Sequence, residues 1–238
     1  MNLEVCIVND RVVPNKLDDR ALYQDFSTFF PKARRVERED VINDFNSYDD
    51  MNMVKYCIKH TSRESHLLIL KTTSVTTETP DTVNSFLQDI MKEKWWDVYF
   101  LCSWEDQCEL WSNFRKVNIN GTTEFRSKAP KGIQALMLTP ESKKMILGAV
   151  PLRNGNYFTF TSKQQLTEQI YRGNLIAGCL TPNLFYFNME IMELDDIHKA
   201  NRCAKPNTRG TRSGSSVDYL WFILALIVII GLAWLLVR

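Results

Sequence analysis

The sequence predicts an α/β domain, with helices on both faces of a mixed β-sheet, followed by one C-terminal transmembrane helix. Three observations carry this prediction. Short runs of consecutive apolar residues, such as 67–70, are typical of strands buried on both faces of a sheet. Segments with helical apolar spacing lie between these runs. Near the end of the chain, residues 219–237 form an apolar stretch without a charge.

The first half of the predicted domain alternates strands and helices. LEVCIVND, at 3–10, predicts a strand, and residues 16–30 predict a helix that ends before a proline. Residues 33–40 are rich in charge and indicate a solvated surface segment. A helix over 51–60 is expected to lead into the buried strand at 67–70.

A strand–helix–strand unit follows. Thr79 and Pro80 mark a helix start, and DVYFLCSW, at 97–104, is a second short buried strand. Asn120-Gly121 stands between two β-prone runs and predicts a hairpin turn. The helix is expected to bury one apolar stripe, made of Val83, Phe86, Leu87 and Ile90.

The last elements repeat this pattern. Residues 133–138 predict a strand, after which Thr139 and Pro140 open a helix. Lys143 and Lys144 are expected to point outward from that helix. A further helix, a turn at Gly173 and an apolar, aromatic segment complete the domain.

Composition agrees with a folded soluble body, because 45% of the residues are hydrophobic and 24% are charged. Six of the 29 basic residues but only one of the 28 acidic residues lie from residue 199 onward. The body is therefore slightly acidic, and we predict no nucleic-acid partner.

Six scattered cysteines show neither CxxC spacing nor a histidine cluster, so no zinc site, other metal site or cofactor is predicted. The N-terminal residues lack the basic and apolar regions of a secretory signal. Reduced thiols on the cytosolic side of a membrane are therefore expected.

A transmembrane anchor is predicted over residues 219–237, which as a helix are about 28 Å long and match a bilayer core. A buried core helix is the alternative, but such helices seldom have apolar residues on every side over this length. Tyr219, Trp221 and Trp234 occupy the interfacial aromatic positions, and Arg238 follows the segment. This pattern predicts a tail anchor with Arg238 at the far face of the membrane.

A flexible basic linker over 198–218 is expected to join the globular domain, 1–197, to the anchor. By the positive-inside rule, its basic residues place the domain on the cytoplasmic side. They also favour anionic lipid, although a linker whose charges only set the topology explains them equally well. These residues are Lys199, Arg202, Lys205, Arg209 and Arg212.

Four segments, taken in order, resemble family 25 of the glycosyltransferases, which includes bacterial lipooligosaccharide and collagen galactosyl enzymes and also occurs in large DNA viruses. They are LEVCIVND, HLLILKTTSV, KWWDVYFLCSW and GIQALMLTPESKKMIL. GCLTPNLFYF is similar to a Pro-Asn-Leu-Phe segment that often closes such domains. The resemblance spans residues 3–187 and implies a glycosyltransferase-A-like, Rossmann-like sheet.

In that family a Glu-Asp-Asp sequence after the buried strand helps to bind a divalent metal and the diphosphate of a nucleotide sugar. Lys71, Thr72 and Thr73 stand in its place, and these side chains cannot supply the carboxylate ligands. The family's Gly-Cys-hydrophobic-Ser-His segment is also missing, although His60 and His66 are near. The resemblance therefore implies a degenerate nucleotide-sugar site with no catalytic residue assigned.

An active enzyme remains an alternative, because Lys71 could neutralise a diphosphate directly, without a metal. The candidate bases are Asp97, Glu105, Asp106 and Glu109. For Glu105 and Asp106, an exposed helix start explains the sequence at least as well.

Three functions follow. The first is a tail-anchored pseudoenzyme that acts as a structural or interaction module, in its most specific form a viral minor capsid or inner-membrane virion protein that links the capsid to lipid. The second is a membrane-tethered, metal-independent glycosyltransferase. The third is a tail-anchored adaptor on an organelle membrane, with a partner surface around Trp95, Trp96, Trp104 and Trp111, although tryptophans are more often core residues.

Overall fold

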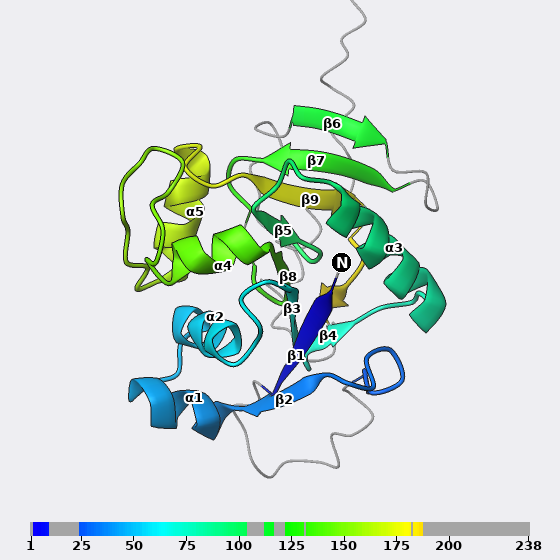
Figure 1. Ribbon diagram of the computed structural model, residues 1–238. Helices are drawn as coiled ribbons and strands as arrows, with labels where there is room; N and C mark the ends of the chain where they lie inside the picture. Colours follow the sequence, from blue (N-terminus) through cyan, green and yellow to red (C-terminus); the bar gives the residue numbers. More distant parts are fainter. Residues whose placement is uncertain are drawn as a thin grey trace, which may run out of the picture. The chain divides into compact units, whose positions relative to one another are not determined.

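The computed structural model describes residues 2–9, 24–103, 112–116, 122–130, 132–181 and 183–187, which form a mixed α/β structure (Figure 1). The chain divides into two compact units, Met1–Lys205 and Pro206–Arg238, and all described residues belong to the first. The predicted α/β class is therefore confirmed for the body. The predicted linker and anchor lie outside the described residues.

A mixed sheet of eight strands runs through the described residues in the order β2-β1-β3-β8-β5-β9-β7-β6. Its strands are β1 (Leu3–Asn9), β2 (Arg34–Glu37), β3 (His66–Lys71), β5 (Val98–Phe100), β6 (Ser112–Lys116), β7 (Thr123–Ser127), β8 (Ala135–Leu138) and β9 (Ala177–Thr181). Strands β2, β1 and β3 are parallel, β8 is antiparallel to β3 and β5, and β5 is parallel to β9. Strands β4 (Ser74–Val75) and β10 (Tyr186–Phe187) form a separate antiparallel pair.

Helices cover both faces of the large sheet, as the sequence predicts (Figure 1). One face carries α1 (Arg38–Phe45), α2 (Asp50–Lys59), α4 (Pro140–Ile146) and α5 (Lys163–Tyr171), and the other carries α3 (Pro80–Lys92). The hydroxyls of Thr79 and Thr139 cap α3 and α4, each ahead of a proline in the first turn, which confirms both predicted helix starts.

The central strands are buried on both faces because successive side chains point to opposite sides of a sheet. In β1, Cys6 and Val8 join the core beneath α1, α2, α4 and α5, whereas Val5 and Ile7 join the core beneath α3. In β3 the whole run 67–70 is 0% exposed. The apolar runs in the sequence therefore identified these strands correctly.

The helix predicted over 16–30 is wrong in its described part. Residues 24–30 form a turn, in which the carbonyl of Phe26 accepts bonds from the amides of Phe29 and Phe30 at 3.1 and 2.9 Å. The rings of Phe26 and Phe29 pack edge to face, 5.5 Å between centroids. Three aromatic side chains close in sequence thus reach the core from a compact turn, and residues 16–23 lie outside the described part.

The charge-rich segment predicted over 33–40 is solvated as expected at Arg34, Arg35, Glu37 and Glu39. It contains the edge strand β2 and the start of α1, and Val36 is 0% exposed. Charged residues occupy the outer positions of this short strand, which is common in edge strands because charge discourages pairing with other chains. The predicted hairpin also agrees with the structure, in the antiparallel pairing of β6 and β7, and its turn lies outside the described residues.

Lys143 was expected to point outward, and this prediction is wrong. Its side chain is buried, and the amine donates to the carbonyl of Ser62 and, at 3.4 Å, to the hydroxyl of Ser65. Burial lowers the pKa of Lys143. The hydroxyl of Ser65 in turn donates to the carboxylate of Glu4 at 2.8 Å, so the amine belongs to a polar network beneath β1 and β3.

Asp97 fixes the beginning of β5. Its carboxylate accepts bonds from Nε and Nη2 of Arg153, at 2.8 and 3.0 Å, and from the amide of Ile176 at 2.8 Å. The residue is only 4% exposed. This bidentate pair therefore ties the loop after α4 to the amino ends of β5 and β9.

Replacement of Asp97 by alanine is expected to lower the stability of the chain by about 3 kcal/mol, because the change leaves the Arg153 guanidinium and a backbone amide without their acceptor. Thermal unfolding of the full chain in mild detergent measures this loss. Asp89→Ala is the matched control, since Asp89 pairs with Lys92 on the surface, and its effect should stay within about 0.5 kcal/mol. Equal effects of the two changes would contradict the anchoring role of Asp97.

Candidate functional site

The candidate site lies where the parallel strands β1 and β3 end, at the carboxyl edge at which open α/β sheets usually bind ligands. Lys71 is the last residue of β3, and its amide donates to the carbonyl of Gln134 at 2.8 Å. The amide of Thr72 donates to the carbonyl of Val8 at 2.9 Å. These bonds hold Lys71, Thr72 and Thr73 at the switch from sheet to loop.

The amine of Lys71 is buried and paired with a carboxylate. Its Nζ lies 2.9 Å from Oδ1 of Asp50, the first residue of α2, and Lys71 is 7% exposed. The other oxygen of Asp50, Oδ2, lies 3.2 Å from Nζ of Lys163, the first residue of α5. The carboxylate of Asp50 thus bridges the amine of Lys71, from β3, and the amine of Lys163, from α5.

Charge keeps Asp50 ionised in this arrangement. Burial on its own would raise the pKa of Asp50, but the charges and hydrogen bonds of Lys71 and Lys163 outweigh burial, and the pKa is lowered overall. The three groups together carry one net positive charge. Lys163 is the more open of the two amines, with 51% of its side chain exposed against 9% for Lys71.

Thr72 and Thr73 also interact with other residues of the protein. The hydroxyl of Thr73 bonds to Oε1 of Gln134 at 3.0 Å, and the neighbouring hydroxyl of Ser74 donates to the carbonyl of Gln134 at 3.2 Å. Thr72 has further polar contacts. Gln134 therefore ties Thr73 and Ser74 to the segment that precedes β8.

The ends of β1 and β2 each add a polar side chain to the same edge. Nδ2 of Asn9 donates to Oε2 of Glu37 at 2.7 Å, and Glu37 caps the start of α1 through a reciprocal capping box with Asp40. The acidic side chain of Glu37 is thus used to close a helix end.

The other candidate residues lie elsewhere. Asp97 is at the amino end of β5, where Arg153 holds it, so the structure does not bring this candidate base to Lys71. His60 follows α2 and His66 opens β3, both at the opposite edge from Lys71. Burial lowers the pKa of His66, and the charge of Lys143 acts in the same direction.

Several predicted residues fall outside the described part of the chain. They are Glu105, Asp106, Glu109, the basic residues Lys199, Arg202, Lys205, Arg209 and Arg212, and the anchor residues Tyr219, Trp221, Trp234 and Arg238. In the residues that the structure describes, no helix combines the length and the apolarity that crossing a bilayer requires. The same residues contain no group of three or more His, Cys, Asp or Glu side chains arranged to hold a metal ion.

Sequence reasoning found Lys71 but missed Asp50, Lys163 and Gln134. Asp50 follows Asp49, whose carboxylate caps α2, so two adjacent aspartates look like one helix start. Lys163 and Gln134 lie far along the chain and carry no local signal. Only the packing of α2 and α5 on the same face brings the two charged side chains to Lys71.

Replacement of Asp50 by asparagine is expected to cost about 2 kcal/mol at neutral pH, because the buried amine of Lys71 loses its counter-charge. A lowered pKa stabilises the fold above the pKa of the unfolded chain, and this contribution disappears as the pH falls through the folded pKa. The gap between the two proteins should therefore narrow below about pH 4. Thermal unfolding of the full chain across pH measures the gap.

Asp44→Asn is the matched control, since Asp44 pairs with Lys59 at an exposed position on the same face. Its effect should be small at every pH. A gap for Asp50→Asn that does not change between pH 7 and pH 3 would show that the charge of Asp50 has no such role.

No family model matches the chain, and no curated protein matches its sequence.

Proposed function

We propose that this chain is a tail-anchored membrane protein whose glycosyltransferase-like domain serves as a structural or interaction module without sugar-transfer activity. The observation that carries the proposal is the ion pair of Lys71 with Asp50. In this pair the amine is buried and already bonded to a carboxylate of the protein. Such an amine is a poor substitute for a metal ion against a diphosphate, because binding would first have to break a buried pair.

The fold supports the first half of the proposal. Parallel strands β2, β1 and β3 end at one edge, and the antiparallel β8 separates β3 from β5 within the same sheet. The segments quoted for the family resemblance supply β1, β3, β8, β5 and β9, which are neighbours in the large sheet, and also β4 and β10, which form the small antiparallel pair. The resemblance thus spans one continuous structural unit.

The sequence supports the second half. Residues 219–237 are long and apolar enough to span a bilayer, and basic residues precede them. A folded domain tethered to lipid through a flexible basic linker can connect the membrane to another protein layer. The specific form that we propose is a minor capsid or inner-membrane virion protein, which links a capsid to the lipid beneath it.

One observation favours a second function, a metal-independent sugar transferase. Two lysines, Lys71 and Lys163, lie together at the carboxyl edge of the sheet, and half of the Lys163 side chain is exposed. The diphosphate of a nucleotide could bind to the amine of Lys163 if Asp50 were displaced. Such an enzyme would act on an acceptor at the cytoplasmic face.

The two functions differ in nucleotide binding. Titration calorimetry of the full chain in mild detergent with uridine diphosphate and its sugar conjugates, with and without Mn²⁺, should detect no saturable binding. Binding that weakens in both Lys71→Ala and Lys163→Ala would support the transferase instead. Lys59→Ala is the control, because Lys59 pairs with Asp44 away from the strand ends.

Membrane attachment is tested separately. Deletion of residues 219–237 should move the protein from the carbonate-resistant membrane fraction to the soluble fraction. Substitution of Lys205 and Arg209 by glutamine is the control, since it alters the linker charge and leaves the apolar segment intact. A deleted protein that stays in the carbonate-resistant fraction would contradict the tail anchor.

A further inference from the structure

In the part of the chain that the structure describes, no strand covers one edge of β1 at its amino end. Strand β2 begins opposite Cys6 and runs away from the start of β1, so Leu3, Glu4 and Val5 have no β2 residue beside them. On its other edge β1 is paired with β3 over its whole length from Leu3. The sheet therefore narrows by one strand at this corner.

The direction of the backbone groups shows which of them face the gap. The carbonyls of Asn2 and Val8 accept bonds from the β3 side, from the amides of His66 and Thr72. Because successive residues of a strand alternate in direction, the groups of Leu3 and Val5 point to the opposite side. In the described residues no strand pairs with the N–H and C=O of Leu3 or with the N–H of Val5.

A cavity of about 790 Å³ occupies this corner. Its walls are the start of β1, the segment 29–34, the end of α2 and the outer side of α3. Phe29 and Phe30 contribute a buried aromatic wall, and Asn84 and Gln88 contribute amides from α3. The volume is in the range of ligand sites, about 300–1,000 Å³, and the open strand edge calls for an occupant with an extended backbone.

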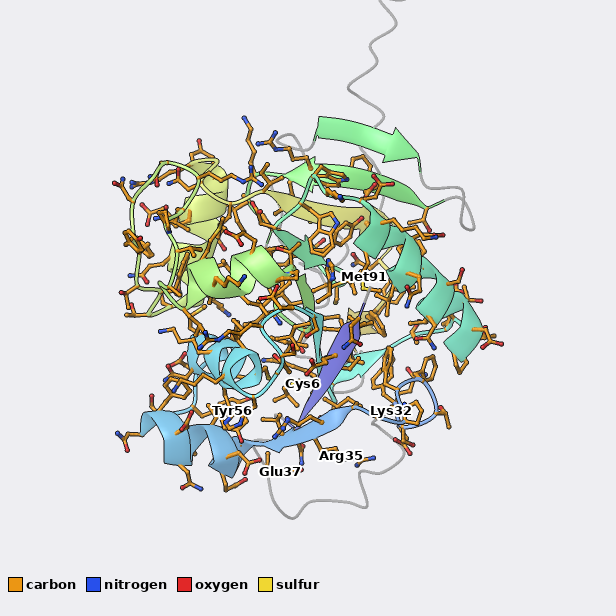
Figure 2. All side chains as sticks on the ribbon, in the orientation of Figure 1. Cys6, Lys32, Arg35, Glu37, Tyr56 and Met91 are labelled. Carbon is orange, nitrogen blue, oxygen red and sulfur yellow. The ribbon has the colours of Figure 1, made fainter. Side chains whose placement is uncertain are left out.

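The charge at the rim is positive. Lys32 and Arg34 line the cavity with exposed side chains, and neither forms an ion pair with a described residue. In Figure 2, Lys32 lies at the start of β2. Glu4 is the one acidic residue in the described lining, and its carboxylate already accepts bonds from the amide of Ser62 and the hydroxyl of Ser65.

We propose that this corner is a docking site for an extended, acidic peptide segment of a partner protein, which adds to the sheet beside Leu3–Val5. The backbone of the peptide would bond to Leu3 and Val5, and its carboxylates would meet Lys32 and Arg34. A second copy of this chain fits less well, because two-fold pairing of the same corner would bring the basic rims together. The proposal does not depend on the membrane anchor or on the degenerate site at the opposite edge.

The probe is the capped peptide acetyl-Val-Glu-Val-Glu-Val-amide, added to the full chain in mild detergent. Its lysine counterpart, with Lys in place of both Glu residues, tests charge, and a version methylated on the backbone nitrogens tests strand pairing. We expect the acidic peptide to bind at least about tenfold more tightly than either analogue. Amide exchange followed by NMR should slow at Leu3 and Val5 when the peptide binds.

Two sets of variants locate the site. Leu3→Pro removes the N–H that faces the gap, at the first position of the strand, where proline is tolerated. Leu3→Ala is its matched control, because it removes the same side chain and keeps the N–H. The acidic peptide should lose its binding to Leu3→Pro and keep it with Leu3→Ala.

The double variant Lys32→Glu/Arg34→Glu should weaken binding of the acidic peptide about tenfold or more and favour the lysine peptide. Lys94→Glu/Lys128→Glu carries the same change in net charge at exposed positions outside the cavity lining, and it should bind normally. Three results would overturn the proposal: no binding of the acidic peptide, equal binding of all three peptides, or self-association of the chain that competes with the peptide.

Discussion

Strand β3 is buried on both faces and paired along both edges, and the rest of the described structure is arranged around it. The interior of a strand in that position must be apolar, so polar side chains can occur only at its two ends. At the carboxyl end the polar side chain is Lys71, which is still largely buried. The protein satisfies it with Asp50, and Asp50 in turn fixes the first turn of α2 against the start of α5.

The carboxyl and amino ends of the parallel strands therefore differ in how fully their polar groups are bonded within the protein. At the carboxyl edge, side chains bond to one another: Lys71 with Asp50, Thr73 with Gln134 and Asn9 with Glu37. At the amino edge, a cavity remains beside the start of β1, with a basic rim. Ligand sites of open α/β sheets are usually at the carboxyl edge, so a domain used for docking would here present the edge that enzymes of this architecture leave alone.

The sequence predicts those parts of the fold that local patterns determine. Thr79 and Thr139, each before a proline, located two helices, and the apolar run 67–70 located the central strand. The prediction of a helix near Phe26 failed because three aromatic residues can reach a core from one turn as well as from one face of a helix. The prediction that Lys143 points outward failed because its burial depends on Ser62 and Ser65, which only tertiary packing brings beneath α4. The site was predictable at Lys71, whereas its partners lie on helices that no local signal connects to it.

The bridging role of Asp50 also constrains how this domain could change. An acidic residue at position 71 would place two carboxylates at hydrogen-bond distance in a largely buried setting, where both could not be ionised together. A single substitution that introduces a carboxylate at position 71 should therefore destabilise the unliganded domain as long as Asp50 remains. The partner that stabilises Lys71 thus also limits which side chains the end of β3 can carry.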